Sequence, residues 1–391
     1  MTHHRAFAFT ASALFLFASA LSNAEDAALE RARRVLAAHP VIDGHNDLPW
    51  AIRENAVAPR DVEAYDLRSR TKGNTDFERL REGGVGGQFW SVYVPAELPT
   101  GFARTQLEQI DIARRVIARY PDRLALATTA DEIERAMKGG RVASLLGMEG
   151  GHAIESSLGA LRAYFDLGGR YMTLTHNKTL DWADAALDTA RHGGLTRFGE
   201  EVVREMNRLG MLVDLSHVSE ETMEDTLRVS EAPVVFSHSS ARALCDHPRN
   251  VPDSVLAKMK ANGGVVMVTF VNVFVSPEWA SGRMPKIPVT IAQVADHVDH
   301  VREVAGADHV GLGGDFDGND SWPEGLSDVS GYPRLLAELV RRGWSDEDLG
   351  RLASGNVLRA MRQAERVARR LAKARPASTA TIESLDGTTG R

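Results

Sequence analysis

The sequence predicts a single-domain (β/α)8 barrel of the TIM type over residues 25–375. Apolar runs of strand length recur eight times, and amphipathic stretches of helical period lie between them. Continuous apolar runs are typical of parallel strands buried on both faces, and eight strand–helix units close this type of barrel. An open doubly wound sheet is the alternative, although no GxGxxG phosphate loop follows the first run.

The expected strands are eight in number and the clearest helices follow three of them. The strands are VIDGH (41–45), GQFWSVYV (87–94), VASLLGMEG (142–150), YMTLTHN (171–177), MLVDLSH (211–217), PVVFSHS (233–239), GGVVMVTF (263–270) and HVGLGGDFDG (309–318). The helix predicted at 196–210 begins after the cap residue Thr196 and ends at Gly210. The stretches 219–230 and 290–306 have the same helical period.

The two ends of the chain differ in composition from the predicted domain. Residues 1–24 combine Arg5, an uncharged apolar run and a small-residue ending, the pattern of a secretory signal peptide. We therefore expect export, and the single cysteine, Cys245, which excludes an internal disulfide, suits a bacterial periplasm. Residues 376–391 are polar, so we expect a disordered tail. The tail also lacks the apolar segment of a lipid-anchor signal, so no stable membrane anchor is expected.

Histidines and carboxylates stand at the carboxyl ends of six of the eight expected strands. They are His45 and Asp47, Glu149, His176, His217, His238 and Asp315. These ends converge on one mouth of a barrel, where active sites are built. Neutral imidazoles and carboxylates are ligands that zinc prefers. The set exceeds the needs of one tetrahedral ion, and two ions sharing a carboxylate would use it. Such a pair can hold a hydroxide and polarise a carbonyl, which is hydrolytic chemistry.

Each of these residues also has an ordinary structural interpretation. A lone His45-x-Asp47 pair is more often a capped turn, and Glu149 could satisfy the amides of a Gly-rich loop. Asp315 could form a turn, whereas a calcium loop would need a run of aspartates and a distal glutamate. His297 and His300 are expected on the polar side of the predicted helix at 290–306 and are excluded as ligands. His152 follows in the same loop as Glu149 and is excluded with less support than these histidines. All of these candidate residues stand at strand ends, which favours a single shared site over a separate structural role for each residue.

The chain resembles the membrane (renal) dipeptidases, zinc peptidases of the amidohydrolase-like barrels. The resemblance covers the predicted domain as far as Gly355-Asn356. It rests on VIDGHNDLPW, GMEGGH, LTHN with WAD at 182–184, RLGMLVDLSHVS, SHSSARALC, HPRNVPD, QVADHVDHVREVAG and VGLGGDFDG with PEGLSDVS.

The resemblance implies a role for each candidate site residue. His45 and Asp47 would bind one Zn²⁺, His217 and His238 would bind the other, and Glu149 would bridge both. Asp315 would hold the substrate's amino group and relay a proton, and His176 would stabilise the oxyanion. Arg249 would pair with the substrate's carboxylate. The implied activity is hydrolysis of dipeptides, including those with a D-residue at the C-terminal position, by a metal-bridged hydroxide.

The chain departs from the mammalian members in three features. It has neither their lipid-anchor tail nor their cysteines, so the homodimer that the resemblance suggests would lack a disulfide link. It also has Val271 and Phe274 where a tyrosine is expected after the seventh strand.

Two other function classes stay open at this stage. One is a barrel hydrolase of cyclic amides or lactones with a carboxylated lysine, for which Lys178 is the nearest candidate. The other is a periplasmic protein that binds metal or solute without turnover. The net charge of −7 excludes nucleic acid as an expected partner.

Overall fold

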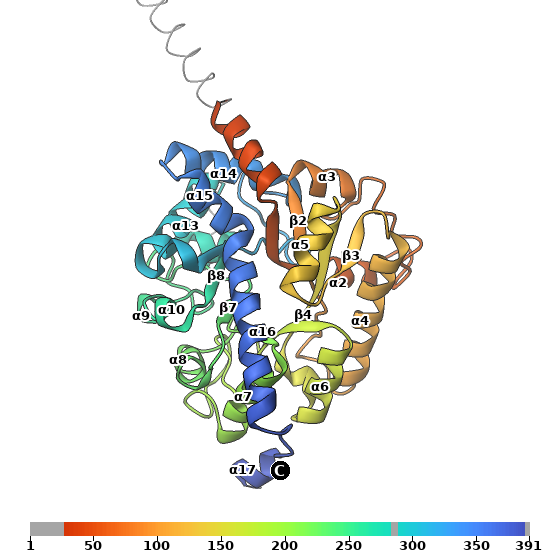
Figure 1. The fold of residues 1–391 in the computed structure, drawn as a ribbon, viewed down its shortest axis with the longest axis vertical. Coiled ribbons are helices and arrows are strands. Elements are labelled where there is room, and N and C mark those ends of the chain that lie inside the picture. The colour runs from red at the N-terminus through yellow and green to blue at the C-terminus, as the bar shows by residue number, and fades with distance from the viewer. Residues whose placement is uncertain (1–26, 283–287, 388–391) are drawn as a thin grey trace, which may run out of the picture.

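The structure is a computed structural model that describes residues 27–282 and 288–387. The predicted signal peptide, residues 1–24, lies outside the described residues. Eight parallel strands form a closed barrel, and helices surround it (Figure 1), so the predicted fold class is confirmed. The strands pair in the order β2-β1-β9-β8-β7-β6-β5-β4, and the additional pairing of β2 with β4 closes this sheet into a barrel.

All eight expected strands are present, and a ninth, short strand accompanies them. The barrel strands are β1 (Val41–Asn46), β2 (Val85–Ser91), β4 (Val142–Glu149), β5 (Gly169–Thr173), β6 (Leu212–Asp214), β7 (Val234–Phe236), β8 (Val265–Val268) and β9 (Val310–Leu312). The additional strand, β3 (Leu124–Leu126), pairs with the first half of β4, whereas β5 pairs with its second half. It was missed because three residues carry no periodic signal.

Helices cover the outside of the barrel and its amino-terminal end. A first helix spans residues 27–38. The others are α2 (Leu48–Arg53), α3 (Phe77–Glu82), α4 (Phe102–Arg119), α5 (Ala130–Lys138), α6 (Leu158–Asp166), α7 (Arg197–Leu209), α8 (Glu220–Val229), α9 (Asp253–Leu256), α10 (Met259–Asn262), α11 (Asn272–Val275), α12 (Pro277–Ala280), α13 (Ile291–Ala305), α14 (Tyr332–Arg341), α15 (Asp346–Gly350), α16 (Asn356–Ala374) and α17 (Ile382–Asp386). Short 3₁₀ turns are η1 (Gly151–Ile154), η2 (Ala307–His309) and η3 (Val329–Gly331), and η4 (Arg351–Gly355) is a π-helical turn.

The predicted ends of α7 are confirmed. The Thr196 hydroxyl accepts a hydrogen bond from the amide of Gly199, which satisfies one of the free amides of the first turn. Gly210 ends the helix with a φ of 84°, a left-handed conformation that a side chain would disfavour. The strand β6 follows directly, so this cap sets where the chain re-enters the barrel.

The long helix α16 closes the amino-terminal end of the barrel. Its Val357, Met361 and Ala364 are buried in one cluster with Ile42 of β1 and Val265 of β8. The cluster lies at the starts of the strands, and in Figure 1 the helix crosses the molecule in blue. The carboxyl ends of the strands are therefore the free end of the barrel, where a site can form.

The tail prediction was wrong for residues 376–387, which are ordered by contacts with the barrel. The amides of Arg197 and Phe198 in the first turn of α7 donate to the Asp386 carboxylate, at 3.0 and 3.1 Å. Arg162 donates to the carbonyl of Ser378. The polar composition of the segment suggested disorder. Its polar groups instead bind the start of α7, a contact that composition alone does not reveal. The remainder of the predicted tail, residues 388–391, lies outside the described residues.

Within the part of the chain that the structure describes, the helices lack the combination of length and apolar character that crossing a bilayer requires.

Asp386→Ala should lower the free energy of unfolding by about 1 kcal/mol, because two helix N-terminal amides lose a charged acceptor. Asp386→Asn keeps an acceptor and should lose less. Urea unfolding followed by circular dichroism measures both. Equal stability of the alanine variant and the parent would show that the tail does not cap α7.

Candidate active site

The candidate residues from six strands meet at the carboxyl end of the barrel. His45 lies within β1 and Glu149 ends β4, while the others follow β1, β5, β6, β7 and β9 by a few residues. They border a cavity of about 500 Å³. Its lining includes Asp47, Glu149, His176, His217, His238, Arg249 and Asp315. His45 lies fully buried beside Asp47 and Glu149.

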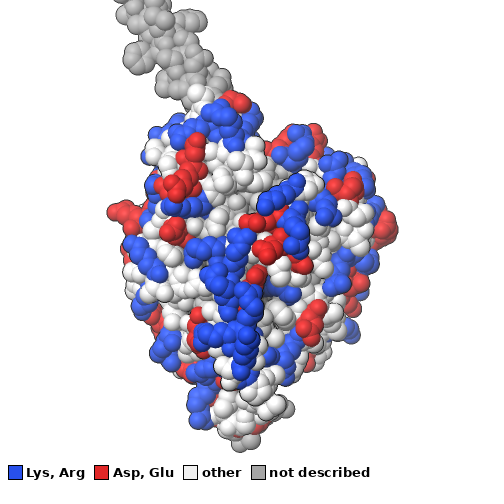
Figure 2. Space-filling view, viewed as in Figure 1, with Lys and Arg blue, Asp and Glu red and all other residues white. Residues whose placement is uncertain are grey.

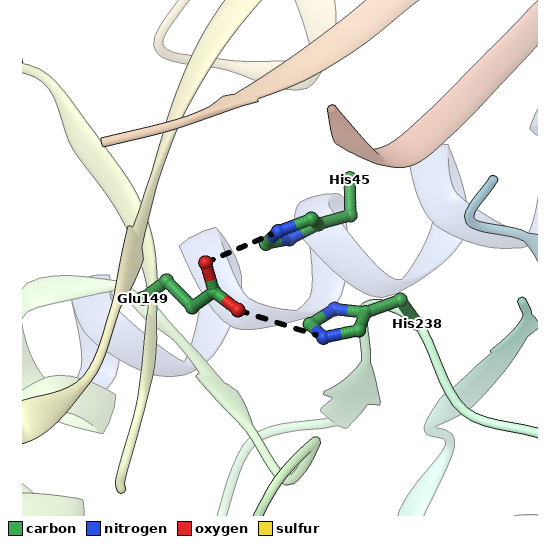
Figure 3. Close-up of side chains that lie close together, drawn as sticks. All are labelled: His45, Glu149 and His238. Atoms are coloured by element: carbon green, nitrogen blue, oxygen red, sulfur yellow. Dashed lines mark ion pairs between the residues drawn. The ribbon is translucent and has the colours of Figure 1, made fainter. Parts of the chain in front are cut away.

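The carboxylate of Glu149 stands between two groups of ligand-type side chains. Its Oε2 lies 3.3 Å from Nε2 of His45, and its Oε1 lies 3.1 Å from Nε2 of His217. Nε2 of His238 is 3.7 Å from the same Oε1, and its ring lies beside that of His45, so that the two rings face different oxygens of Glu149 (Figure 3). Asp47 joins the first group, with its Oδ2 3.3 Å from Nε2 of His45. Each oxygen of Glu149 therefore faces a separate set of ligands.

Three histidines hold their Nδ1 atoms in hydrogen bonds on the side away from Glu149. Nδ1 of His45 lies 2.7 Å from the hydroxyl of Tyr171, and this hydroxyl donates to the carbonyl of Gly44. The phenol oxygen is thus left to accept the Nδ1–H of His45. Gly147 makes this approach possible, because a Cβ there would lie 2.1 Å from the Tyr171 ring.

The other two histidines are oriented in the same sense by different partners. Nδ1 of His217 lies 2.9 Å from Oδ1 of Asn177, which can only accept. Nδ1 of His238 lies 2.8 Å from the hydroxyl of Ser237, which donates to the buried carboxylate of Asp214 at 2.6 Å. In His217 and His238 the proton is therefore on Nδ1 and a bare Nε2 points toward Glu149, and in His45 the same arrangement leaves Nε2 as the ligand atom.

These bare nitrogens fit a metal ion. Nε2 of His217 and Nε2 of His238 are 2.9 Å apart, and with both protons on Nδ1 two lone pairs face each other. Nε2 of His45 is buried without a hydrogen-bond partner. Burial, assisted by Arg249, holds the pKa of His217 and of His238 well below the ordinary value, which keeps both rings in the neutral, ligating form. The described residues thus form three overlapping groups with the atoms to hold a cation, and Glu149 belongs to two of them.

Arg249 is a buried cation that faces the cavity without a carboxylate partner among the described residues. Its side chain is 2% exposed, and it makes only long contacts of 3.4 Å to the Ser239 hydroxyl and the His238 carbonyl. Its guanidinium carbon lies 5.1 Å from the centre of the Phe274 ring. Burial lowers its pKa to about 10, so it stays charged at neutral pH. A buried unpaired guanidinium favours a bound anion.

Asp315 and His176 complete the polar lining. Burial, together with the charges of Asp47 and Glu149, raises the pKa of Asp315 well above its ordinary value, so it takes up a proton readily. Nε2 of His176 lies 3.7 Å from Oε1 of Glu149, and its Nδ1 has no hydrogen-bond partner. Burial lowers the pKa of this ring, which leaves it neutral.

Several site residues were missed by sequence reasoning. Trp50, Tyr93, Asn177, Leu187, Val273, Gly318 and Asn319 also line the cavity. Tyr93 follows β2, but it falls inside the longer predicted strand at 87–94, so it gave no signal in the sequence. Tyr171 gave none, because it lies inside an apolar run. Val271 and Phe274 do line the cavity, in place of the tyrosine that the family pattern expects.

Three residues considered in the sequence have other roles or positions. Nε2 of His152 bonds to the carbonyl of Val94 at 2.9 Å, and His152 is in none of the cation-holding groups. Lys178 is exposed and does not line the cavity, which disfavours a carboxylated-lysine site. His297, which we expected on the polar side of its helix, is instead 1% exposed.

Comparisons with known proteins agree with this geometry. The sequence matches the membrane dipeptidase family, peptidase family M19, over residues 29–375. The chain belongs to the membrane dipeptidase family. By this membership and by its buried ligand cluster it is a metallo-dipeptidase with a metal-binding active site.

Two relatives and two solved structures illustrate how closely the chain resembles other proteins. Dipeptidase 3 of Mus musculus is 44% identical over 345 residues, which cover 86% of this chain and 67% of the mouse protein. Dipeptidase 3 of Rattus norvegicus is also 44% identical, with 86% of this chain and 68% of the rat protein covered.

The solved structures extend the likeness to the fold. A metallopeptidase from Rhodobacter sphaeroides, liganded with a phosphinate mimic of the dipeptide L-Ala-D-Ala, superposes with a TM-score of 0.75 and 29% identity. This match covers 83% of this chain and 99% of the bacterial one. Dipeptidase AC, of peptidase family M19, gives a TM-score of 0.74 and 30% identity, over 83% of this chain and 98% of its own.

Tyr171→Phe should weaken zinc binding by roughly ten- to 100-fold while the dipeptidase stays folded, because His45 loses the acceptor that fixes its proton on Nδ1. Competition with a zinc-chelating dye measures the affinity without reference to turnover. Tyr164→Phe, which removes a hydroxyl bonded to the Ala153 carbonyl away from the cluster, is the control. Equal zinc affinity of the parent and Tyr171→Phe would refute the orienting role.

Proposed function

We propose that this dipeptidase carries two zinc ions bridged by Glu149 and hydrolyses free dipeptides, including those with a D-residue at the C-terminal position. The observation that carries the proposal is the position of Glu149, whose two oxygens face separate ligand groups 3.1 to 3.7 Å away.

The ligand sets follow the family resemblance, and the distances around Glu149 support them. His45 and Asp47 would hold one ion beside Oε2 of Glu149, and His217 and His238 would hold the other beside Oε1. The mixture of imidazole and carboxylate ligands favours zinc. When bound, such a pair supplies an activated water and polarises the carbonyl that is attacked.

The substrate would be held at its two charged ends. Arg249 pairs with the terminal carboxylate, since its guanidinium is buried and lacks a partner carboxylate among the described residues. Asp315, on the β9 side of the cavity, holds the free amino group. With one charge fixed at each end, the distance between them selects two residues, and a longer peptide would have to bury an uncharged, unpaired end.

Two groups of the chain would assist bond cleavage. The raised pKa of Asp315 suits a relay that takes the proton released by the attacking water and delivers it to the nitrogen of the leaving amine. His176 stands beside the cluster and would donate an N–H to the oxyanion that forms on the carbonyl.

The proposal of a D-residue at the second position has separate support. The Rhodobacter sphaeroides metallopeptidase is liganded with a mimic of L-Ala-D-Ala. In this chain the hydroxyl of the expected tyrosine is replaced by the apolar side chains of Val271 and Phe274, which line the same cavity. A small apolar side chain of either hand would contact them without leaving a polar group unpaired.

We also propose that the protein is exported, with residues 1–24 as its signal peptide, and acts in a bacterial periplasm as a homodimer without disulfides. The composition of that segment and the single cysteine support export. The dimer rests on the family resemblance alone.

The direct test of the function is an assay with L-Ala-L-Ala, L-Ala-D-Ala and the tripeptide L-Ala-L-Ala-L-Ala, before and after dialysis against a chelator. Both dipeptides should be cleaved and the tripeptide should not. Chelation should abolish turnover, and added Zn²⁺ should restore it. Metal uptake without any turnover would instead indicate a metal-binding protein.

Glu149→Ala should remove metal from both positions, because the shared carboxylate is lost from each. His217→Ala, which changes one group only, should keep about one ion per chain. Metal content after gel filtration, measured by plasma mass spectrometry, distinguishes the two. Two ions in Glu149→Ala would rule out the bridge.

Arg249→Ala should raise the KM for L-Ala-L-Ala on the order of 100-fold and change kcat less, since it removes a charge-assisted pair to a non-reacting group. A dipeptide amide, which lacks the carboxylate, is the matched control: the parent and the variant should handle it alike. A KM for the free dipeptide that does not change would contradict the anchoring role.

A further inference from the structure

We propose that the exposed face of α16 is a docking surface for anionic phospholipid bilayers. Arg366, Arg369, Arg370 and Lys373 occur at the spacing i, i+3, i+4, i+7, which places them on one face of the helix, and all four are exposed. Arg359 and Arg362 continue the row toward the start of the helix. Figure 2 shows the result as a column of blue side chains over α16. We call this row the α16 basic face.

Three of the four exposed members of the α16 basic face have no acidic partner among the described residues. Among the residues that the structure describes, none places a carboxylate within 4.0 Å of Arg366, Arg369 or Lys373, whereas Arg370 pairs with Glu231 and Arg362 with Glu134, both at 2.7 Å. Surface arginines elsewhere on the chain are largely paired with neighbouring acids, and the net charge is −7. A row of unpaired cations on a negatively charged protein therefore concentrates positive potential at one place.

The shape of the α16 basic face fits a surface of phosphate headgroups. From Arg359 to Lys373 the row is about 21 Å long at 1.5 Å per residue, and the opposite face of the helix, with Val357, Met361 and Ala364, is buried against the barrel. The helix therefore offers charge and no apolar face for insertion. Clusters of four to eight basic residues on a helix attract anionic lipids in this way.

Docking at this face would leave the active site accessible. Arg359 donates to the carbonyls of Gly263 and Asp308, which lie two residues before β8 and β9. α16 thus lies at the amino ends of the strands, while the cavity lies at their carboxyl ends. A dipeptidase bound through α16 would hold its cavity away from the bilayer and open to soluble substrate.

The test is co-sedimentation of the full chain with vesicles of 30% phosphatidylglycerol in phosphatidylcholine, compared with vesicles of pure phosphatidylcholine. The parent should bind the anionic vesicles, and 0.5 M salt should release it, since exposed charges are screened. The triple variant R366Q/R369Q/K373Q should lose binding on the order of 100-fold. Its turnover of L-Ala-L-Ala should equal that of the parent, which shows that it is folded.

A matched triple variant, R34Q/K72Q/R104Q, removes the same charge from three exposed residues outside α16 that have no ion pair. It should bind anionic vesicles like the parent. The proposal fails if the parent does not bind, if it binds both vesicle types alike, or if the two triple variants lose binding equally. Binding to duplex DNA that R366Q/R369Q/K373Q loses, without vesicle binding, would replace it with a nucleic-acid surface. The vesicle-binding outcomes do not depend on the zinc or dipeptide assignments, which enter only through the turnover that shows folding.

Discussion

The position of one buried carboxylate, that of Glu149, organises the active site. It is the last residue of β4, and its side chain reaches toward histidines from β1, from the loop after β6 and from the loop after β7. Ser91 at the end of β2 donates to its Oε2 at 3.0 Å, which fixes the orientation of the carboxylate from a fourth strand. An isolated carboxylate in such a place would be very unfavourable. The histidines around it therefore bring ligand atoms that would share a cation with this carboxylate and offset its charge.

A layer of buried polar side chains beneath the mouth holds these ligands. Tyr171 and Asp214 each back one histidine, directly or through Ser237. Asp43 of β1 accepts from the amide of Gly314 at 2.8 Å, so the strand that carries His45 is tied to the chain after β9. Burial raises the pKa of Asp43 to about 6. The barrel core is thus apolar near the amino ends of its strands and polar near their carboxyl ends, and the transition occurs where Tyr171 lies across the interior.

The fold and the meeting of the candidate residues at one end of the barrel could be read from the sequence because both depend on local patterns. Apolar runs of strand length can be recognised in the sequence. When the strands are parallel, the residues that follow these runs all lie at the same end of the barrel. The role of Tyr171 could not be predicted from the sequence. Its ring reaches His45 only because Gly147, on a different strand, leaves room for it. The prediction of a disordered tail was wrong for the same reason, because the contact that orders the tail joins distant parts of the chain. Asp386 caps α7, and nothing between residues 376 and 391 indicates the presence of that helix end.

Backbone strain is concentrated at the mouth, and the barrel explains how it is tolerated. His217, Asp315 and Asp317 have φ values of 70°, 62° and 63°, a left-handed conformation that costs a non-glycine residue of order 1 kcal/mol. Hydrogen bonds hold two of these turns: the Asp315 amide donates to the His45 carbonyl at 3.1 Å, and the Ala186 amide donates to the His217 carbonyl at 2.7 Å. The left-handed turn ends each strand abruptly. His217 therefore points across the mouth toward Glu149, and Asp315 is placed beside Asp47, close enough to form one cation-holding group with His45. The strain is the consequence of turning a side chain from the strand direction into the centre of the barrel, and the rigid strands on both sides supply the stability that maintains it.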